Sequence, residues 1–279
     1  MSNRPGSAFE SGGLLIVGAG VMGSALCEAV LAQGLATPEK ITVAAPSPER
    51  REGLRARLGV RTVAQAAEGL PGALMVILAV KPQVFPQVAA ELQGRIPESA
   101  VVLSIMAGLP IQRIADDLAH PAVVRSMPNA AARVLQSATI WCAAPAVTSD
   151  QRHLAQAVLE AIGEAIEVSD ERFLDMATAV SGSGPAFLCL AAEAMIEGAV
   201  AVGFTRPMAQ RLVYQTLTGT AALLAQPGAH PALVRESVTS PGGTTAAGLQ
   251  ALEQRAVRAA FVEAIRAALA RAQELGSSR

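Results

Sequence analysis

The sequence predicts an α/β protein in two parts: a Rossmann-like, doubly wound parallel sheet followed by an all-helical domain. Three observations support this prediction. In the first half, short apolar runs that suit strands alternate with longer runs that suit helices, which is the order of βαβ units. Residues 73–80 (ALMVILAV) are almost continuously apolar, as expected of a strand buried on both faces. After about residue 170 the strand-like runs end and apolar residues recur at helical spacing.

The elements of the sheet domain can be placed one by one. Strands are expected where short apolar runs occur, at residues 14–17, 41–44, 73–80, 100–104, 123–126, 139–143 and 166–168. Helices are expected between them, at residues 21–33, 49–58, 84–92, 111–118 and 153–162. This order implies a mainly parallel sheet, because parallel neighbours need a crossover connection.

The second part is expected to contain only helices, at residues 173–180, 185–202, 207–224 and 256–275. Leu188, Ala192, Met195 and Ile196 recur at helical spacing within the second of them. Residues 1–12 are polar and contain glycine, with no apolar run. The chain is therefore expected to divide into three segments: a disordered N-terminus (1–12), a sheet domain (13–169) and a helical domain (170–279).

A glycine motif follows the first expected strand and opens the first helix. It has the pattern G-x-G-x-x-G in the strand–turn–helix context that a dinucleotide site requires. The first glycine permits a tight turn, the second lets the backbone approach a diphosphate, and the third lets the helix pack against the strand. Free N–H groups at the helix start would favour the anion. The motif comprises Gly18, Ala19, Gly20, Val21, Met22 and Gly23.

The end of the second strand bears on the choice of cofactor. Sites that prefer NAD usually carry Asp or Glu there, bound to the ribose 2′-hydroxyl. This sequence has Ala45 at that point, followed by Ser47, Arg50 and Arg51. A hydroxyl and guanidinium groups suit a 2′-phosphate, although two arginines also suit an ordinary solvated helix start. We therefore expect NADP(H), with NAD(H) as the alternative.

Further loops leave strands at the same edge of the sheet, where doubly wound folds bind ligands. One contains Lys81, which could contact the ribose or phosphate of the cofactor or could simply lie on the surface. SIMAGL (104–109) and RSMPN (125–129) follow two later strands, and their small or amide side chains would border a nicotinamide. The cofactor contacts expected here are Ala79, Val80, Lys81, Met106, Ala107 and Gly108.

Composition argues against several classes of protein. The formal net charge is −1 and 3% of the residues are aromatic, so neither a basic surface nor stacking groups for nucleic acid are expected. No run reaches the ~18 uninterrupted apolar residues of a membrane span. Cys27, Cys142 and Cys189 are scattered and odd in number, so they predict neither disulfides nor a metal site. With no signal-peptide pattern, we expect a cytoplasmic protein that binds no metal, nucleic acid or membrane.

The few lysines and histidines limit the acid–base catalysis that the chain can supply. Lysine occurs only as Lys40 and Lys81, and the three histidines lie in loop-like or helix-end settings. Neither a histidine base nor a Ser-His-Asp arrangement is evident. A protonated imine already carries electrophilic charge, so hydride reduction of an imine depends mainly on positioning. An imine substrate therefore suits the chain better than a substrate whose reduction needs a strong acid or base from the protein.

The helical half contains two motifs at which a substrate could bind. In VSGSGPAF (180–187), Gly184 and Pro185 suit a helix start, and the glycines allow close backbone approach to a ring. In SVTSPGGTT (237–245), glycines expose N–H groups just before a helix and threonines add hydroxyls. The second motif would bind a carboxylate at the helix N-terminus, unless it is a plain turn between helices.

Together with VKP (80–82), SIMAGL and RSMPN, these motifs make the chain resemble the pyrroline-5-carboxylate reductase family over about residues 14–275. The resemblance implies reduction of L-1-pyrroline-5-carboxylate to L-proline with NADPH or NADH, the last step of proline biosynthesis. It also implies a dimer with interlaced helical domains, often a ring of dimers, in which the partner completes the site.

The resemblance also implies roles for single residues. Thr245 corresponds to the family's proposed acid near the ring nitrogen, and Glu171, through a looser match, to an acidic neighbour of the substrate. The implied carboxylate-binding residues are Ser240, Gly243, Thr244 and Thr245. Two positions depart from the family pattern. Ala45 replaces a common Ser, Thr or Asn, and Ala66 stands where many members carry Asn, which weakens contacts to the 2′-phosphate and the adenosine.

Three alternatives compete with this interpretation. Hydroxyacid dehydrogenases of the 6-phosphogluconate type share both domain types but use a lysine in the helical domain, where this chain has none. The substrate could instead be another imine acid, such as a piperidine carboxylate or a keto-acid–amine adduct, selected by how tightly residues 180–187 close over it. A non-catalytic regulator or scaffold would bind NADPH without consuming it.

Overall fold

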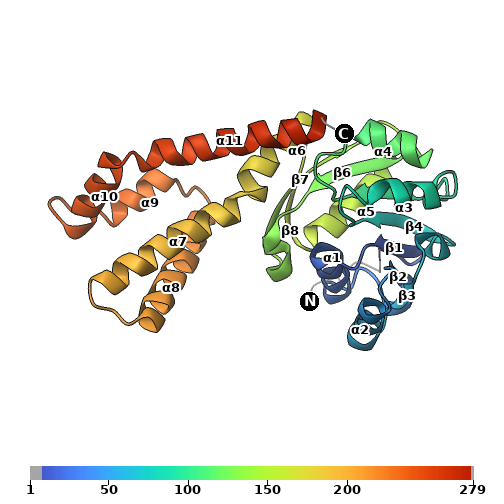
Figure 1. Cartoon of the computed structure of the whole chain (residues 1–279), viewed down its shortest axis with the longest axis horizontal. Helices are drawn as coiled ribbons and strands as arrows, with labels where there is room; N and C mark the ends of the chain where they lie inside the picture. Colours follow the sequence, from blue (N-terminus) through green and yellow to red (C-terminus); the bar gives the residue numbers. More distant parts are fainter. Residues whose placement is uncertain (1–7, 278–279) are drawn as a thin grey trace. The chain divides into compact units, whose positions relative to one another are not determined.

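The computed structural model describes residues 8–277 and contains an eight-stranded sheet (Figure 1). The strand order is β3-β2-β1-β4-β5-β6-β7-β8. Neighbouring strands are parallel except for β6 and β7, which are antiparallel. The strands are β1 (Gly13–Val17), β2 (Ile41–Ala44), β3 (Arg61–Val63), β4 (Ala73–Leu78), β5 (Val101–Ser104), β6 (Val123–Met127), β7 (Ser137–Ala143) and β8 (Gly163–Glu167).

The chain changes its direction of winding between β1 and β4. It first winds outward from β1 through β2 to β3, and then returns to place β4 on the other side of β1. Val17 of β1 lies opposite Leu78 of β4, so the two strands end at the same level. In doubly wound sheets, ligands bind beyond the carboxyl ends of the strands at such a switch point.

Helices cover both faces of this sheet, because successive side chains of a strand point to opposite faces. Leu14 and Ile16 of β1 face a core shared with α1 and α5, whereas Leu15 and Val17 face a core shared with α3 and α4. The helices of this part are α1 (Val21–Ala32), α2 (Pro48–Leu58), α3 (Phe85–Leu92), α4 (Ile111–Leu118), α5 (Ser149–Glu160) and α6 (Arg172–Ala177).

Every strand and helix that the sequence predicts for the sheet is present, with ends that shift by at most four residues. Strand β3 escaped prediction because it has only three residues, of which Arg61 is exposed. The antiparallel pairing of β6 and β7 was also not foreseen. No α-helix separates these two strands, and only a short 3₁₀ helix, η3 (Ala130–Val134), lies between them, so the chain reverses without a crossover.

The prediction of a disordered N-terminus is wrong for residues 8–12. Phe9 is fully buried in the core beneath α1 and α5. The Lys40 ammonium donates a hydrogen bond of 3.0 Å to the carbonyl oxygen of Glu10. A single aromatic residue in a polar stretch creates no periodic pattern, so the sequence did not reveal its burial. Residues 1–7, which belong to the same prediction, lie outside the described residues.

The contacts divide the chain into two compact units. One unit ends at Ser183 and also includes the chain from Ala268 onward, and the other spans Gly184–Ala267. Helix α6 packs on β6 and β7 and therefore belongs with the sheet. The predicted boundary between residues 169 and 170 would instead assign α6 to the helical domain. The assignment of separate functions to the two predicted domains stays a prediction.

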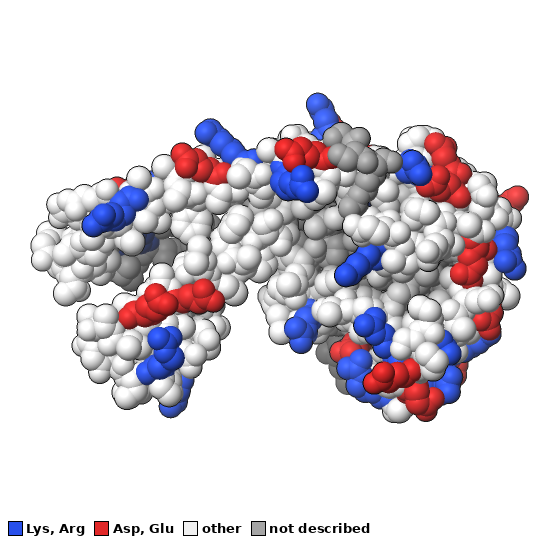
Figure 2. All heavy atoms as spheres, viewed as in Figure 1, with Lys and Arg blue, Asp and Glu red and all other residues white. Residues whose placement is uncertain are grey.

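The second unit consists of helices and has a very small core of its own. Residues Ala192 and Ile196 of α7 pack against Ala209 and Val213 of α8. Many large apolar side chains of these helices remain exposed in the single chain, including Leu188 and Leu190. Figure 2 shows broad uncharged surface between separate groups of charged side chains here. The helices are α7 (Gly184–Ala201), α8 (Arg206–Leu224), α9 (Pro231–Ser237), α10 (Thr244–Gln254) and the start of α11 (Val257–Ser277).

One continuous helical stretch among the described residues, 172–201, is long and apolar enough by composition to cross a membrane. It joins α6, a π-helical turn η4 (Thr178–Gly182) and α7. Because α6 packs on the sheet and α7 packs on α8, contacts within the chain account for part of this apolar surface.

Candidate active site

The glycine motif forms the turn between β1 and α1 at the switch point. Gly18 has φ +113°, and a Cβ atom there would lie 2.6 Å from the carbonyl oxygen of Ala79. A Cβ atom at Gly23 would overlap the carbonyl oxygen of Gly18. The turn therefore requires both glycines, Gly18 where it packs against the end of β4 and Gly23 where α1 packs against the turn itself.

Gly20 differs, because nothing in the described chain requires it to lack a side chain. A Cβ atom there would meet no atom within 4 Å, and its φ of −79° is accessible to any residue. Gly20 is the N-cap of α1, and no side chain caps this helix. The free N–H groups and the open space above Gly20 suit a diphosphate that approaches the backbone closely. The residues present thus fit a dinucleotide cofactor.

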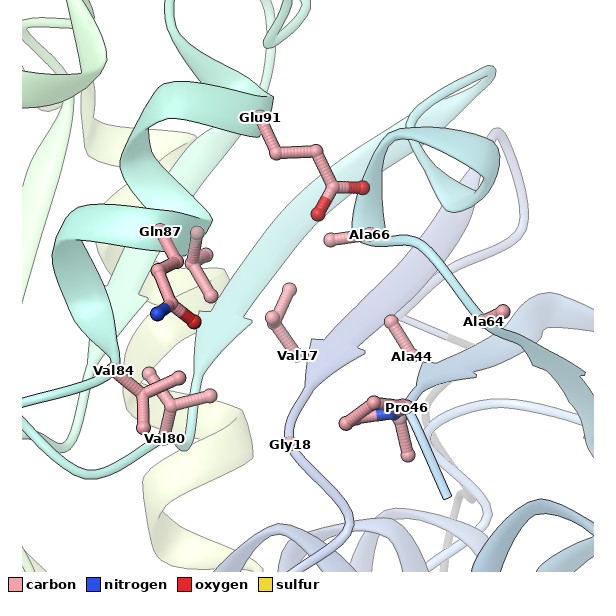
Figure 3. A pocket seen from close by; sticks show the side chains of 12 residues that line it. Val17, Gly18, Ala44, Pro46, Ala64, Ala66, Val80, Val84, Gln87 and Glu91 are labelled. Atoms are coloured by element: carbon pink, nitrogen blue, oxygen red, sulfur yellow. The ribbon is translucent and has the colours of Figure 1, made fainter. Parts of the chain in front are cut away.

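A cleft of ≈ 180 Å³ opens beside this turn (Figure 3). Its walls come from the ends of β1 and β2, the loop after β3, residue 80 beyond β4, and one face of α3. The lining is mostly apolar, with two polar side chains, as is usual for sites that bind small molecules. The lining residues are Val17, Gly18, Ala44, Ala45, Pro46, Ala64, Ala66, Val80, Val84, Gln87, Val88 and Glu91.

The residues predicted to hold a 2′-phosphate lie at the start of α2. Some of their side chains already form hydrogen bonds within the protein, and one is free to bind a ligand. The Ser47 hydroxyl is the N-cap of α2 and accepts the N–H of Arg50 at 3.3 Å. The Arg51 guanidinium donates to the carbonyl oxygens of Ala45 and Pro46 at 2.7 and 2.9 Å. The Arg50 side chain is exposed, and the structure gives it no partner in the described part of the chain. Of the two arginines, Arg50 is therefore the one free to meet a ligand.

The other predicted cofactor residues leave β4 and β5 at the same edge of the sheet. Ala79 and Val80 are half-buried, and Lys81 is exposed. Met106 is buried in the core under α3 and α4, and its N–H donates to the Ser104 hydroxyl at 3.2 Å. Neither the side chain nor the N–H of Met106 is thus available to a cofactor. Ala107 is exposed and Gly108 adopts φ +71° in the same loop.

The side chains of RSMPN serve internal packing. The Ser126 hydroxyl donates to the Ser104 carbonyl oxygen at 3.1 Å. The Asn129 amide donates to the Ser181 carbonyl oxygen at 3.0 Å, which fastens this loop to the π-helical turn η4. Isolated π-helical turns are frequent near functional sites. These contacts order the edge of the sheet, although the sequence suggested that the segment borders a nicotinamide.

A buried ion-pair cluster, which the sequence did not reveal, joins three elements beside this edge. The Arg125 guanidinium on β6 is buried and lies 2.7 Å from a Glu171 carboxylate oxygen and 3.0 Å from an Asp175 oxygen. The same Glu171 oxygen accepts the N–H of Ile111 at the start of α4 at 2.8 Å. Glu171 was predicted to neighbour the substrate. That role stays a prediction, and its observed role is structural.

Replacement of Arg125 by alanine is expected to lower the free energy of unfolding by about 2–3 kcal/mol. Removing one member of a buried ion pair leaves uncompensated charge, which typically costs ~3–5 kcal/mol, and the partial exposure of both carboxylates reduces this figure. Urea unfolding followed by circular dichroism measures the loss. Arg55→Ala is the matched control, because Arg55 pairs with Glu52 at an exposed site and should change stability by less than about 1 kcal/mol. Equal losses in the two variants would contradict the role of the cluster.

In the second unit, residues Ser240 to Thr245 form the turn that leads into α10. Gly242 has φ +67°, and a Cβ atom at Gly243 would overlap the Ser240 hydroxyl. Gly243 is the N-cap of α10 and has no side-chain cap of its own. The first N–H groups of an eleven-residue helix are therefore available to an anion.

The two threonines open this helix. Thr244 is exposed and Thr245 is half-buried. The structure gives the Thr245 hydroxyl no hydrogen-bond partner within residues 8–277. Thr245 lies two residues after the N-cap Gly243. If the free N–H groups bind a carboxylate, the Thr245 hydroxyl can act on a group attached close to it. Among residues 8–277, no group of three or more His, Cys, Asp or Glu could hold a metal ion.

Comparisons with known proteins find relatives along the whole chain. The family model described as pyrroline-5-carboxylate reductase dimerisation matches residues 171–275, and that described as NADP oxidoreductase, coenzyme F420-dependent, matches residues 14–108. The chain is 41% identical over 261 residues to pyrroline-5-carboxylate reductase of Synechocystis sp., covering 94% of this chain and 97% of that protein. It is 40% identical to the enzyme of Thermus thermophilus, covering 95% and 99%.

Solved structures with similar folds include two reductases. The pyrroline-5-carboxylate reductase of Coxiella burnetii gives a TM-score of 0.88 at 32% identity, covering 95% of this chain and 99% of that one. The pyrroline carboxylate reductase of Plasmodium falciparum, solved with NADP bound, gives 0.85 at 26% identity, covering 96% and 99%. The likeness therefore extends over both units.

Proposed function

The chain belongs to the pyrroline-5-carboxylate reductase family, and from this premise we propose how its residues carry out the reaction. It is an NAD(P)H-dependent oxidoreductase that reduces L-1-pyrroline-5-carboxylate to L-proline, the last step of proline biosynthesis. The observation that carries this function is the full-length likeness to reductases of that name, at 41% identity in one case.

The cofactor side of the site is proposed to follow the edge of the sheet. The turn at Gly18, Gly20 and Gly23 would hold the diphosphate, with the helix dipole of α1 favouring its charge. Residues 45–50 would hold the adenosine ribose and its 2′-phosphate, and residues 79–81 and 106–108 would border the nicotinamide. The bound cofactor supplies the hydride. What the chain adds is orientation, which can account for a large part of the barrier to a bimolecular reaction.

The substrate side is proposed to be the start of α10. The N–H groups that follow Gly243 would bind the substrate carboxylate, together with the hydroxyls of Ser240 and Thr244. The Thr245 hydroxyl would then donate a hydrogen bond to the unprotonated ring nitrogen, so that this nitrogen gains a proton as the ring carbon accepts hydride. The lack of a hydrogen-bond partner for the Thr245 hydroxyl among residues 8–277 supports this role.

The direct test follows absorbance at 340 nm when pyrroline-5-carboxylate is added, with NADPH and NADH in parallel. Rapid loss with NADPH is the expected result. Rapid loss of absorbance with NADH alone would support the reductase activity but contradict the proposed role of residues 45–50 in binding the 2′-phosphate. If NADPH binds but neither cofactor is consumed, larger cyclic imine acids become the next substrates to try, and a non-catalytic role follows if these also fail.

Arg50→Ala is expected to raise the KM for NADPH about fivefold and to leave the KM for NADH unchanged. One exposed contact between a guanidinium and a phosphate is worth about 1 kcal/mol, which corresponds to that factor. Initial rates over a range of each cofactor measure it. Arg57→Ala removes an exposed arginine of the same helix, paired with Glu28, and should alter neither constant. A parallel rise for both cofactors would show that Arg50 does not recognise the 2′-phosphate.

The chain self-associates through its helical unit, which the dimerisation family model matches. We propose a dimer that further assembles into a ring of dimers, and a cytoplasmic location. The exposed apolar residues of α7 and α8 support the dimer, because patches of this kind on one chain usually mark subunit contacts. Light scattering during size-exclusion chromatography would give the mass of the assembly. A mass equal to two chains would support the dimer and contradict the ring of dimers.

A further inference from the structure

The cleft beside the glycine turn has only two side chains that can form directed hydrogen bonds, and both come from α3. Gln87 and Glu91 are one helical turn apart and line the same wall. The remaining lining is valine, alanine, proline and glycine. The cleft lies on the β2 side of the switch point, next to residues 44–46. For a dinucleotide whose diphosphate lies on the turn at Gly18–Gly23, this is the adenosine side.

Glu91 is held in a fixed position. One oxygen of its carboxylate accepts the N–H of Ala67 at 2.8 Å, which fastens α3 to the loop after β3. The side chain is half-buried. Figure 3 shows the other oxygen turned towards the interior of the cleft, and the structure gives it no partner among residues 8–277. Its direction is therefore set before any ligand arrives.

The chemistry of that oxygen selects among bases. An ionised carboxylate only accepts hydrogen bonds. Adenine presents an exocyclic amino group, which donates, whereas hypoxanthine presents a carbonyl oxygen at the same position, which would repel the carboxylate. Resting on the NAD(P)H-dependent function above, we propose that Glu91 recognises the exocyclic amino group of the cofactor's adenine and makes the site selective for adenine over hypoxanthine dinucleotides.

Neighbouring features support this assignment. Apolar side chains that line the cleft, such as Val17 and Val84, suit contact with a flat base. Ala66 is buried and leaves room at the wall next to Glu91. The Gln87 amide can donate or accept and so cannot discriminate by itself. Glu91 is therefore the specificity-determining group of this wall.

Glu91→Gln tests the proposal with almost no change of shape. The amide oxygen can keep the bond to the Ala67 N–H, and the NH2 group then replaces the free oxygen, so an acceptor becomes a donor. Isothermal titration calorimetry would measure Kd for NADPH and for its hypoxanthine analogue, without substrate. The unaltered protein should bind NADPH about tenfold more tightly, equal to ~1.4 kcal/mol. In Glu91→Gln the ratio should fall to about one or reverse.

The control is Glu98→Gln, which removes an exposed charge outside the cleft and should keep the tenfold ratio. The same ratio in Glu91→Gln as in the unaltered protein would overturn the role of Glu91 alone. Failure of the unaltered protein to bind either dinucleotide would overturn the cofactor site as well. Equal thermal unfolding midpoints in the two variants would show that the loop contact survives, and a fall confined to Glu91→Gln would assign it a structural role instead.

Discussion

Thr245→Ala is expected to lower kcat for pyrroline-5-carboxylate by about 100-fold, because general acid assistance by a positioned group typically contributes ~10²–10⁴-fold. The change removes a hydroxyl at the start of α10 that has no partner among the described residues, so folding should be little affected. Steady-state kinetics give kcat and KM, and calorimetry gives the Kd for NADPH, which should stay constant. Unchanged turnover would remove Thr245 from the mechanism.

Two controls separate the hydroxyl from the rest of the side chain. Thr245→Ser keeps the hydroxyl and should retain most of the activity. Thr244→Ala removes the exposed hydroxyl one residue earlier and should raise the KM more than it lowers kcat, because that group is assigned to carboxylate binding. If Thr245→Ser is as slow as Thr245→Ala, the methyl group or the local backbone, and not the proton, is responsible.

The second large effect is expected from Gly20→Ala, which should raise the Kd for NADPH about 100-fold, equal to ~2.7 kcal/mol. The added methyl group would occupy the open space over the N-terminus of α1, where the diphosphate must approach the backbone. Because that methyl meets no protein atom within 4 Å, the free energy of unfolding should fall by less than about 1 kcal/mol.

Gly23→Ala is the control for Gly20→Ala, because it is expected to affect stability where Gly20→Ala affects cofactor binding. Its methyl group would overlap the carbonyl oxygen of Gly18, so the turn must shift and stability should fall by about 2–3 kcal/mol. Calorimetric binding and urea unfolding on both variants would separate the two roles. If Gly20→Ala bound NADPH normally, the diphosphate would not lie over that residue.

Pairing of the two active-site variants tests the dimer that the resemblance implies. If the loop at residues 240–245 of one chain completes the cofactor site of its partner, a refolded mixture of Gly20→Ala and Thr245→Ala should recover about a quarter of the normal activity. Half of the randomly formed dimers are mixed, and each mixed dimer has one intact site. No recovery would mean that each chain supplies both parts of its own site.

Prediction from the sequence worked best where one local pattern determines structure. Apolar runs of strand length and the strand–turn–helix context of Gly18–Gly23 identified the sheet and its switch point, because both depend on neighbours within a few residues. The helical second part was likewise readable from spacing. Its α9 was missed, since it has only seven residues and no buried position to create a pattern.

The contacts that the sequence did not reveal join distant segments of the chain. Arg125 and Glu171 are 46 positions apart and meet only because β6 and α6 pack together. Glu91 is 24 positions from Ala67, and nothing about a glutamate in an amphipathic helix distinguishes it from a solvated one. The burial of the Met106 side chain was likewise not evident from its place in a predicted cofactor loop, and its contact with the cofactor stays a prediction.

The small core between α7 and α8 has a consequence for the energetics of the whole enzyme. Four buried residues stabilise these two helices, far too few to offset the entropy of ordering them. Contacts with another chain are then expected to complete their folding, which would make folding and association linked equilibria. The apparent stability of the helical unit is therefore expected to rise with enzyme concentration, and dilution is expected to lower the activity.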